Sequence, residues 1–284
     1  MSRRKIVGLI PHSERPEAQR LAAEASKHLV ASGAVVRVLE SDAPELKEFH
    51  VASDSFTDGL DIAVSLGGDG TMLRAVDLVS SAGIPVLGVN VGQLGYLAEV
   101  EPGAISDALK RVVAGDYTVV ERMMLSVEVE GETFSGSWNA LNEAVLEKSQ
   151  AGRIVRLDVS INGTFFTTYA ADGVIVATPT GSTAYSFSAR GPIVSPRHNC
   201  MVLTPVSPHM LFDRALVLDP SEEVCFDLKG SLSAVLTLDG REIGILDAGA
   251  SVRCTGAEHP ALIATFGPRD FHQVLKAKFG LADR

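Results

Sequence analysis

The hydrophobic pattern of this chain changes near Tyr117, and this change constrains the fold more than any other feature of the sequence. Before Tyr117, short apolar runs alternate with segments of helical spacing, which is typical of a parallel sheet covered by helices on both faces. After Tyr117, segments with a period of two are separated by turn signals such as Asn162-Gly163 and Asp239-Gly240. These signals favour antiparallel hairpins.

The sequence therefore predicts an α/β domain over residues 1–117 and an antiparallel all-β domain of two layers over residues 118–265. A length of 284 residues agrees with two hydrophobic cores. Residues 266–284 include a helical pattern over 271–279, and we expect this final helix to return to the N-terminal domain and pack on it. In the first domain we expect strands over 5–10, 35–39, 62–66 and 85–89, and helices over 16–32, 71–81 and 104–114.

The charge and the cysteine content narrow the class of partners. The formal net charge is -10, which argues against a nucleic-acid partner bound by a general basic field. No apolar run is long enough to span a bilayer, so we expect no membrane partner. The three cysteines, Cys200, Cys225 and Cys254, are too widely spaced for a disulfide framework or a CxxC metal site. We therefore expect a cytoplasmic protein whose cysteines lie in the core.

The string Gly67-Gly68-Asp69-Gly70-Thr71 ends an apolar run and precedes a helical pattern. Its glycines allow the backbone to approach phosphate, and the first turn of the following helix offers free amides. Asp69 would then lie beside the phosphate, where a carboxylate holds a metal or accepts a proton. The string lacks the Lys-Ser/Thr ending of a P-loop and the spacing of a dinucleotide-binding motif. A tight turn with an N-capping aspartate explains it about equally well.

A second polar string, Thr178-Pro179-Thr180-Gly181-Ser182-Thr183-Ala184-Tyr185, follows a predicted strand. Its hydroxyls and backbone donors are suited to a nucleotide, and the ring of Tyr185 is able to stack on a base. Taken alone, however, the string is better explained by a capped helix start and a core tyrosine. Asn142-Glu143 lies in an apolar stretch. This pair either faces solvent at a strand end or hydrogen-bonds a ribose or a base.

Several isolated side chains are ambiguous on their own. Arg74 lies one turn into the helix after Gly70, where it either reaches a phosphate or faces solvent. Arg153 and Arg156 flank a strand start and are equally ambiguous. An isolated histidine such as His209 is more often structural than catalytic.

In combination, these motifs resemble the NAD kinase family. The chain has Gly-Gly-Asp-Gly-Thr at 67–71, Asn142-Glu143, and Asp172-Gly173 followed by Thr-Pro-Thr-Gly-Ser-Thr-Ala-Tyr at 178–185, in the order and spacing of that family. Pro208-His209 and Asp239-Gly240 fit as well, and the resemblance covers nearly the whole chain. The first string is shared with lipid kinases and relatives of phosphofructokinase, whereas the two strings together are highly specific.

The resemblance implies phosphorylation of the 2′-hydroxyl of the adenosine ribose of NAD, which gives NADP, with Asp69 as the base that faces this hydroxyl. The implied phosphoryl donor is ATP, with polyphosphate as an alternative, and NADH is a second candidate acceptor. We expect a divalent metal, Mg²⁺ carried with the donor, whose protein ligands the sequence does not identify. The implied assembly is a homodimer or homotetramer. The implied NAD-binding residues are Asp69, Gly70, Arg74, Asn142, Glu143, Arg153, Asp172, Thr183, Ala184, Tyr185, Ser186, Phe187 and Ser188.

Two positions depart from the family pattern, and one further loop resembles it. Arg190 stands where the family usually has glycine, and Arg241 stands where an amide residue is common. If position 190 requires a positive φ, arginine is unfavourable there by roughly 1–3 kcal/mol; otherwise Arg190 adds a cation near anionic substrates. We therefore assign no substrate contact to Arg241 on the basis of the family. The loop from Gly92 to Tyr96 resembles the family's stretch beside the nicotinamide half of NAD.

Two other functions stay open as alternatives. A lipid kinase would share the first string, lack the second, and contain an apolar lipid cleft. A non-catalytic sensor would bind NAD or NADP without turnover, for example because Arg190 disturbs its loop. The presence of Asp69, Asn142 and Glu143 favours the enzyme.

Overall fold

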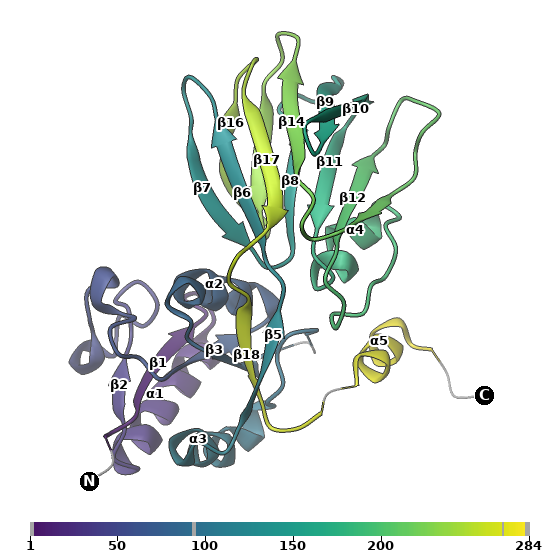
Figure 1. The fold of residues 1–284 in the computed structure, drawn as a ribbon. Coiled ribbons are helices and arrows are strands. Elements are labelled where there is room, and N and C mark those ends of the chain that lie inside the picture. Colours follow the sequence, from purple (N-terminus) through teal and green to yellow (C-terminus); the bar gives the residue numbers. More distant parts are fainter. Residues whose placement is uncertain (1–2, 93–94, 269, 282–284) are drawn as a thin grey trace. The chain divides into compact units, whose positions relative to one another are not determined.

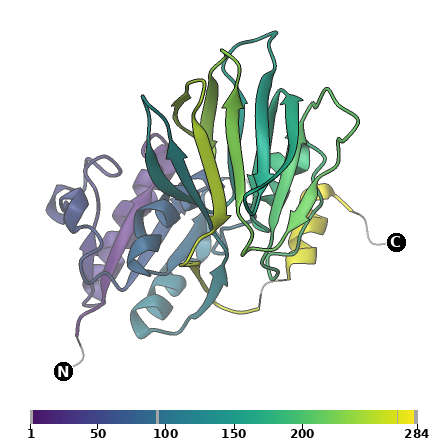
Figure 2. The same ribbon diagram turned by 45° about the horizontal axis from the view of Figure 1, so that its top comes forward.

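The computed structural model describes residues 3–92, 95–268 and 270–281 of the chain, which divide into two compact units (Figures 1 and 2). The first unit comprises Met1–Glu121 and Ala261–Arg284, and the second comprises Arg122–Pro260. The second unit is thus inserted into the first along the chain. Among the described residues, no helix is long and apolar enough to cross a bilayer.

The first unit is built on one six-stranded sheet. Its strands are β1 (Ile6–Pro11), β2 (Val35–Arg37), β3 (Ile62–Gly67), β4 (Val86–Asn90), β5 (Thr118–Arg122) and β18 (Ala261–Thr265), and its helices are α1 (Pro16–Ala31), α2 (Asp69–Val79), α3 (Ile105–Ala114) and α5 (Phe271–Phe279). The strand order is β2-β1-β3-β4-β18-β5. The pairs β1–β2, β1–β3, β3–β4 and β4–β18 are parallel. This arrangement confirms the α/β class that the alternating pattern predicts.

Apolar residues at helical spacing attach the helices to the two faces of this sheet. Leu21 of α1 and Leu109 of α3 are buried in one cluster with Leu87 and Val89 of β4. Gly88 points to the opposite face, where a Cβ atom would lie 3.2 Å from Sδ of Met72 in α2. The sheet is therefore covered by α1 and α3 on one side and by α2 on the other (Figure 1).

The chain returns to the first unit earlier than the sequence predicts. The predicted β domain extends over residues 118–265, but β18 pairs with β4 through Ile263 and Val86, and β5 lies beside β18 in the same sheet. The apolar pattern of a short strand does not indicate which sheet the strand joins, because either sheet would bury it. The final helix, α5, has no buried residue, and Nζ of Lys278 lies 5.1 Å from the centre of the Tyr96 ring.

The second unit contains two antiparallel sheets of six strands each. One sheet consists of β6 (Leu125–Glu130), β7 (Gly136–Ala140), β9 (Val155–Ile161), β10 (Thr164–Ala171), β14 (Val224–Lys229) and β17 (Ser251–Gly256), and the other consists of β8 (Glu143–Lys148), β11 (Gly173–Ala177), β12 (Met201–Val206), β13 (Leu216–Leu218), β15 (Ala234–Leu238) and β16 (Arg241–Leu246). Their orders are β10-β9-β14-β17-β6-β7 and β13-β12-β11-β8-β15-β16. A single cluster of buried side chains, including Val127 and Phe226 from the first sheet and Leu146 and Leu236 from the second, joins the two. The predicted two-layer β domain is thereby confirmed.

The strands β8, β11 and β12 of the second of these sheets are buried on both faces. Val145, Ile175 and Val202 turn away from the inter-sheet core and form a separate cluster, against which Ala189 and Val194 pack. The covering segment includes the short helix α4 (Tyr185–Ser188). Burial on both faces explains why β8 and β11 read as continuous apolar runs rather than as alternating strands.

Four described residues other than glycine have a positive φ: Asn162, Arg190, Ser207 and Asp239. Asn162 and Asp239 each precede a glycine in a hairpin turn, as their Asn-Gly and Asp-Gly signals predict. Arg190 follows α4 and has a φ of 70°. Position 190 therefore adopts the left-handed conformation that favours glycine.

We predict that Arg190→Gly stabilises the protein by roughly 0.5–1 kcal/mol. The left-handed conformation disfavours a side chain by roughly 1–2 kcal/mol, which exceeds the extra chain entropy that glycine loses on folding, roughly 0.5–1 kcal/mol. Calorimetry of the ligand-free protein measures the change as a rise in Tm. The control is Ala189→Gly, where φ is -85°, and this change should lower Tm. A Tm for Arg190→Gly at or below the wild-type value contradicts the prediction.

Candidate active site

The Gly67–Thr71 string forms the turn between β3 and α2, and the helix begins at Asp69 itself rather than at Thr71 as predicted. At Gly67 a Cβ atom would lie 2.1 Å from Oγ1 of Thr71, so only glycine allows the helix to start this close to the strand. Gly67 is paired with Asn90 at the ends of β3 and β4. The turn thus lies at the carboxyl ends of parallel strands, which is where such sheets bind ligands.

The carboxylate of Asp69 is fixed by the backbone that follows β4. Its Oδ2 accepts a hydrogen bond from N–H of Tyr96 at 2.8 Å, and its Oδ1 accepts one from N–H of Leu97 at 3.1 Å. A Cβ atom on Gly95 would lie only 2.0 Å from Oδ1, so the contact requires glycine at this position. Residues 93 and 94 of the predicted nicotinamide loop lie outside the described residues.

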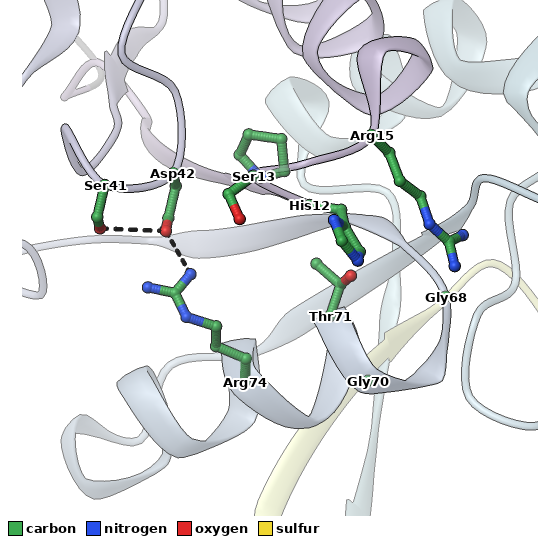
Figure 3. A pocket seen from close by; sticks show the side chains of 10 residues that line it. His12, Ser13, Arg15, Ser41, Asp42, Gly68, Gly70, Thr71 and Arg74 are labelled. Atoms are coloured by element: carbon green, nitrogen blue, oxygen red, sulfur yellow. Dashed lines mark hydrogen bonds and ion pairs between the residues drawn. The ribbon is translucent and has the colours of Figure 1, made fainter. Parts of the chain in front are cut away.

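A pocket of about 420 Å³ lies in the first unit beside the same turn (Figure 3). Arg74, one helical turn after Asp69, donates to the carboxylate of Asp42. Gly70 and Arg74, which the sequence predicts to bind NAD, both line this pocket. The lining residues are Pro11, His12, Ser13, Arg15, Ser41, Asp42, Gly68, Gly70, Thr71 and Arg74.

In the second unit, the Asn142-Glu143 pair is positioned by Asp239 from the β15–β16 turn. The Asp239 carboxylate accepts three backbone hydrogen bonds, from N–H of Leu141 at 2.8 Å, of Asn142 at 2.7 Å and of Glu143 at 3.1 Å. The N–H of Asp239 in turn donates to the carbonyl of Glu143 at 3.1 Å. A charged acceptor of three amides rigidly fixes the start of β8.

Glu143 is a buried acid whose surroundings favour the protonated form. Its side chain is only 6% exposed, and Oε2 has no hydrogen-bond partner among the described residues. Burial, together with the nearby charge of Asp239, raises the pKa of Glu143 to about 8, although N–H of Tyr185 donates to the carboxylate and opposes the shift. Near neutral pH this side chain therefore offers an O–H donor as well as acceptor capacity.

The second predicted string forms a tight turn against the Asn142 backbone. Thr178 donates from Oγ1 to the carbonyl of Leu141 at 2.6 Å, and its N–H donates to the carbonyl of Asn142 at 2.8 Å. A Cβ atom on Gly181 would lie 2.0 Å from the Asn142 carbonyl oxygen. The two motifs, which are separated by more than thirty residues in the sequence, are thus one structural element.

Glu147 and Lys148, two neighbouring residues of β8, connect this turn to Asp172. The hydroxyl of Tyr185 donates to Glu147 at 2.5 Å, while its ring stays 37% exposed. Lys148 forms an ion pair with Asp172 at 2.5 Å. Asn142, Glu143, Asp172 and Tyr185 are therefore brought together, and the exposed ring is available for stacking.

The other predicted residues of this unit have different surroundings. Ser186 is completely buried and its hydroxyl hydrogen-bonds that of Thr204 at 3.0 Å, so this side chain supports the loop. Phe187 and Ser188 are exposed, and Thr183 and Ala184 are half-buried. Arg153 is exposed in the turn between β8 and β9.

Sequence reasoning did not identify Asp42, Arg15 or Glu147 as part of these sites, and it placed Gly95 only in the loop that resembles the family's nicotinamide stretch. His12 and Arg15 follow β1, so the rule that ligands bind at the carboxyl ends of parallel strands is the signal that points to them. Asp239 was recognised as part of a hairpin signal and of a family element, but not as the acceptor of the amides of residues 141–143. The described residues contain no group of three or more His, Cys, Asp or Glu side chains placed to hold a metal ion.

The chain matches two protein-family models and a full-length relative. Residues 7–117 match the model of the ATP-NAD kinase N-terminal domain, and residues 141–265 match that of the ATP-NAD kinase C-terminal domain. An NAD kinase from Geobacter metallireducens is 40% identical over 282 residues, which cover 99% of this chain and 100% of that protein.

Two solved structures share the fold. The chain is similar to yeast NADH kinase in a crystal structure with NADH, with a TM-score of 0.92, 25% identity, and coverage of 100% of this chain and 90% of that chain. It is also similar in fold to an NAD kinase from Archaeoglobus fulgidus in complex with ATP, with a TM-score of 0.73, 23% identity and coverage of 97% of each chain.

The raised pKa of Glu143 predicts a pH-dependent stability of the ligand-free protein. Below pH 4.5, the ordinary pKa of the group, the folded and unfolded chains both carry the proton. Between pH 4.5 and about 8 the unfolded chain releases this proton while the folded chain keeps it, so the free energy of unfolding falls as the pH rises. Glu143→Gln should flatten this decrease in urea unfolding measured across that window. The control Glu128→Gln, at an exposed position of β6, should keep the wild-type slope, and an unchanged slope in Glu143→Gln refutes the prediction.

We also predict that Gly95→Ala destabilises the protein through Asp69. The new Cβ atom would lie 2.0 Å from Oδ1 of Asp69, and overpacking of this kind costs about 1–3 kcal/mol. Removal of the carboxylate in Asp69→Ala should relieve the contact, so Gly95→Ala should lower Tm in the wild-type background but not in the Asp69→Ala background. Gly103→Ala, which meets no atom within 4 Å, is the control. Equal losses of Tm in both backgrounds would show that the contact does not exist.

Proposed function

The chain belongs to the NAD kinase family, and on this premise we propose that it transfers a phosphoryl group from ATP to the 2′-hydroxyl of the adenosine ribose of NAD, with Asp69 as the general base. NAD kinase activity follows from the family; the residue roles and the donor are the proposal. The observation that carries the roles is the geometry of Asp69, a carboxylate fixed by two backbone amides at the start of α2.

The two amide contacts suit Asp69 to proton transfer. A sugar hydroxyl is a poor nucleophile, and its proton leaves late as the bond to phosphorus forms. Each oxygen of the Asp69 carboxylate accepts one backbone N–H, and a carboxylate oxygen has a second lone pair. Asp69 therefore keeps the capacity to accept the hydroxyl proton while its orientation is fixed.

Positioning and charge neutralisation supply most of the acceleration in phosphoryl transfer. Arg74 offers a guanidinium in the pocket beside the Gly67–Thr71 turn. We propose that Mg²⁺ enters with the phosphates of ATP, because this ion usually binds through substrate phosphates, waters and one or two carboxylates. When bound, it neutralises charge that develops on the transferred group.

In the second unit, we propose that Asn142, Glu143, Asp172 and Tyr185 bind NAD. The exposed ring of Tyr185 is suited to stacking on adenine. Glu143 keeps one carboxyl oxygen without a partner among the described residues, and a ribose hydroxyl would satisfy it. Arg153, Thr183, Ala184, Phe187 and Ser188 stay predicted NAD-binding residues.

The alternatives give different results in simple assays. A family match over nearly the full chain favours an NAD kinase over a lipid kinase. A sensor would bind NAD in calorimetry without forming NADP. To identify the phosphoryl donor, NADP formation is compared with ATP and with polyphosphate. To identify the acceptor, NADP formation from NAD is compared with NADPH formation from NADH. A cytoplasmic location and a homodimer or homotetramer also stay predictions, and light scattering measures the assembly.

We predict that Asp69→Asn lowers kcat by about 10² or more, because the amide keeps the size of the side chain and one of its two backbone contacts but cannot accept the proton. NAD binding, measured by calorimetry, should stay within about threefold of the wild type. The control is Asp107→Asn, in the exposed first turn of α3, which should leave kcat unchanged. A kcat for Asp69→Asn within threefold of the wild type would remove Asp69 from the role of base.

A further inference from the structure

A buried carboxylate lies in the pocket of the first unit. Asp42 is only 1% exposed. Its Oδ1 accepts hydrogen bonds from Arg74 and, at 3.2 Å, from the hydroxyl of Ser41, whereas Oδ2 is buried without a partner among the described residues. Burial of a carboxylate with an unpaired oxygen is unfavourable. The fold therefore keeps Asp42 at the expense of stability, which points to a role outside folding.

Hydrogen bonds join two walls of this pocket. Nε2 of Gln19 in α1 donates to the carbonyl of His12 at 3.0 Å and to that of Asp42 at 2.7 Å. One side chain thus ties the loop after β1 to the loop after β2. The turn from Gly68 to Thr71 after β3 provides the third wall. Because β2, β1 and β3 are adjacent in the sheet, all three walls lie at the carboxyl ends of neighbouring parallel strands, a general location of ligand sites.

The charges of the pocket favour an anion, although the protein as a whole has a net charge of -10. Figure 3 shows Arg15 and Arg74 in the pocket, from the start of α1 and from α2. The first turn of α2 adds a helix N-terminus, whose amides and dipole favour phosphate. Asp42 is the acidic residue of the pocket lining, and its carboxylate forms an ion pair with Arg74.

We infer, on the basis of the proposed function, that this pocket binds the phosphate chain of a substrate and that Asp42 is the positioning residue that fixes Arg74 for it. A free arginine side chain loses considerable rotamer entropy when it is ordered. Asp42 orders Arg74 before the ligand arrives, so the ligand does not bear this loss. A guanidinium carries five N–H donors in a fixed fork, and it therefore bridges a carboxylate and a phosphate at once. The phosphate chain in question is the diphosphate of NAD or the triphosphate of ATP, since both offer phosphate oxygens to a guanidinium.

The test measures the Kd of NAD and of ATP with Mg²⁺ by calorimetry, in an Asp69→Asn background that prevents turnover. Asp42→Asn should weaken one of the two ligands by about 10-fold or more, as expected for a lost charge-assisted contact, and should leave the other within threefold. The weakened ligand identifies the source of the phosphate chain. Equal Kd values with and without Asp42→Asn, for both ligands, would overturn the inference.

A double-mutant cycle distinguishes positioning from a general effect on the fold. If Asp42 acts through Arg74, then Asp42→Asn should change neither Kd in an Arg74→Ala background. Losses that multiply instead would overturn the positioning role. The control is Asp61→Asn, which removes another ion-paired aspartate, bonded to Arg3 at 2.8 Å in the same unit, and should leave both Kd values unchanged.

A second variant tests the pocket if Asp42→Asn does not fold. Arg74→Lys keeps the charge beside Asp42 but loses the fork that reaches two partners, so it should weaken the same single ligand by about 10-fold. Wild-type affinity for both ligands in Arg74→Lys would overturn the inference. Failure of the proposed function would be seen separately, as absence of NADP formation by the wild-type enzyme.

Discussion

The predicted NAD-binding half of the second unit depends on the hydrogen bonds from three successive backbone amides to the Asp239 carboxylate. They fix the start of β8 and with it Asn142, against whose carbonyl Gly181 packs without room for a side chain. They also bring a charged group close to Glu143, and this charge adds to the larger effect of burial in raising the pKa of that acid. A single aspartate in a hairpin turn thus fixes the geometry of one motif, supports the packing of a second and contributes to the protonation of a buried acid.

The first unit uses the same physical device at Asp69. There too a carboxylate accepts backbone amides from a segment distant in the sequence, and Gly95, which has no room for a Cβ atom, makes the approach possible. Both acids combine a charge with fixed backbone dipoles, which orient the carboxylate better than mobile side chains would. Glycines in these motifs are therefore required by close contact as well as by backbone conformation.

The sequence was sufficient for the fold class and the family, because both depend on local patterns. The hairpin signals at Asn162-Gly163 and Asp239-Gly240 predicted their turns, and the two strings together indicated the family that the comparisons show. Residues 261–265 were included in the predicted β domain although β18 pairs with β4, because this partner is more than 170 residues away in the sequence. The contact between Asp42 and Arg74 could not be predicted either, because it joins residues 32 positions apart and neither neighbourhood in the sequence signals it.

The insertion of one unit into the other has a consequence for biosynthesis. Residues 122–260 form a continuous stretch with its own core, so this unit is complete as soon as its last strand leaves the ribosome. The first unit begins the chain, yet β18 separates β4 from β5 in its sheet. The gap between β4 and β5 is closed only after residues 122–260 have been translated. We therefore expect the nascent chain to expose an unfinished sheet while the second unit is translated, a state in which unpaired strand edges are prone to aggregation.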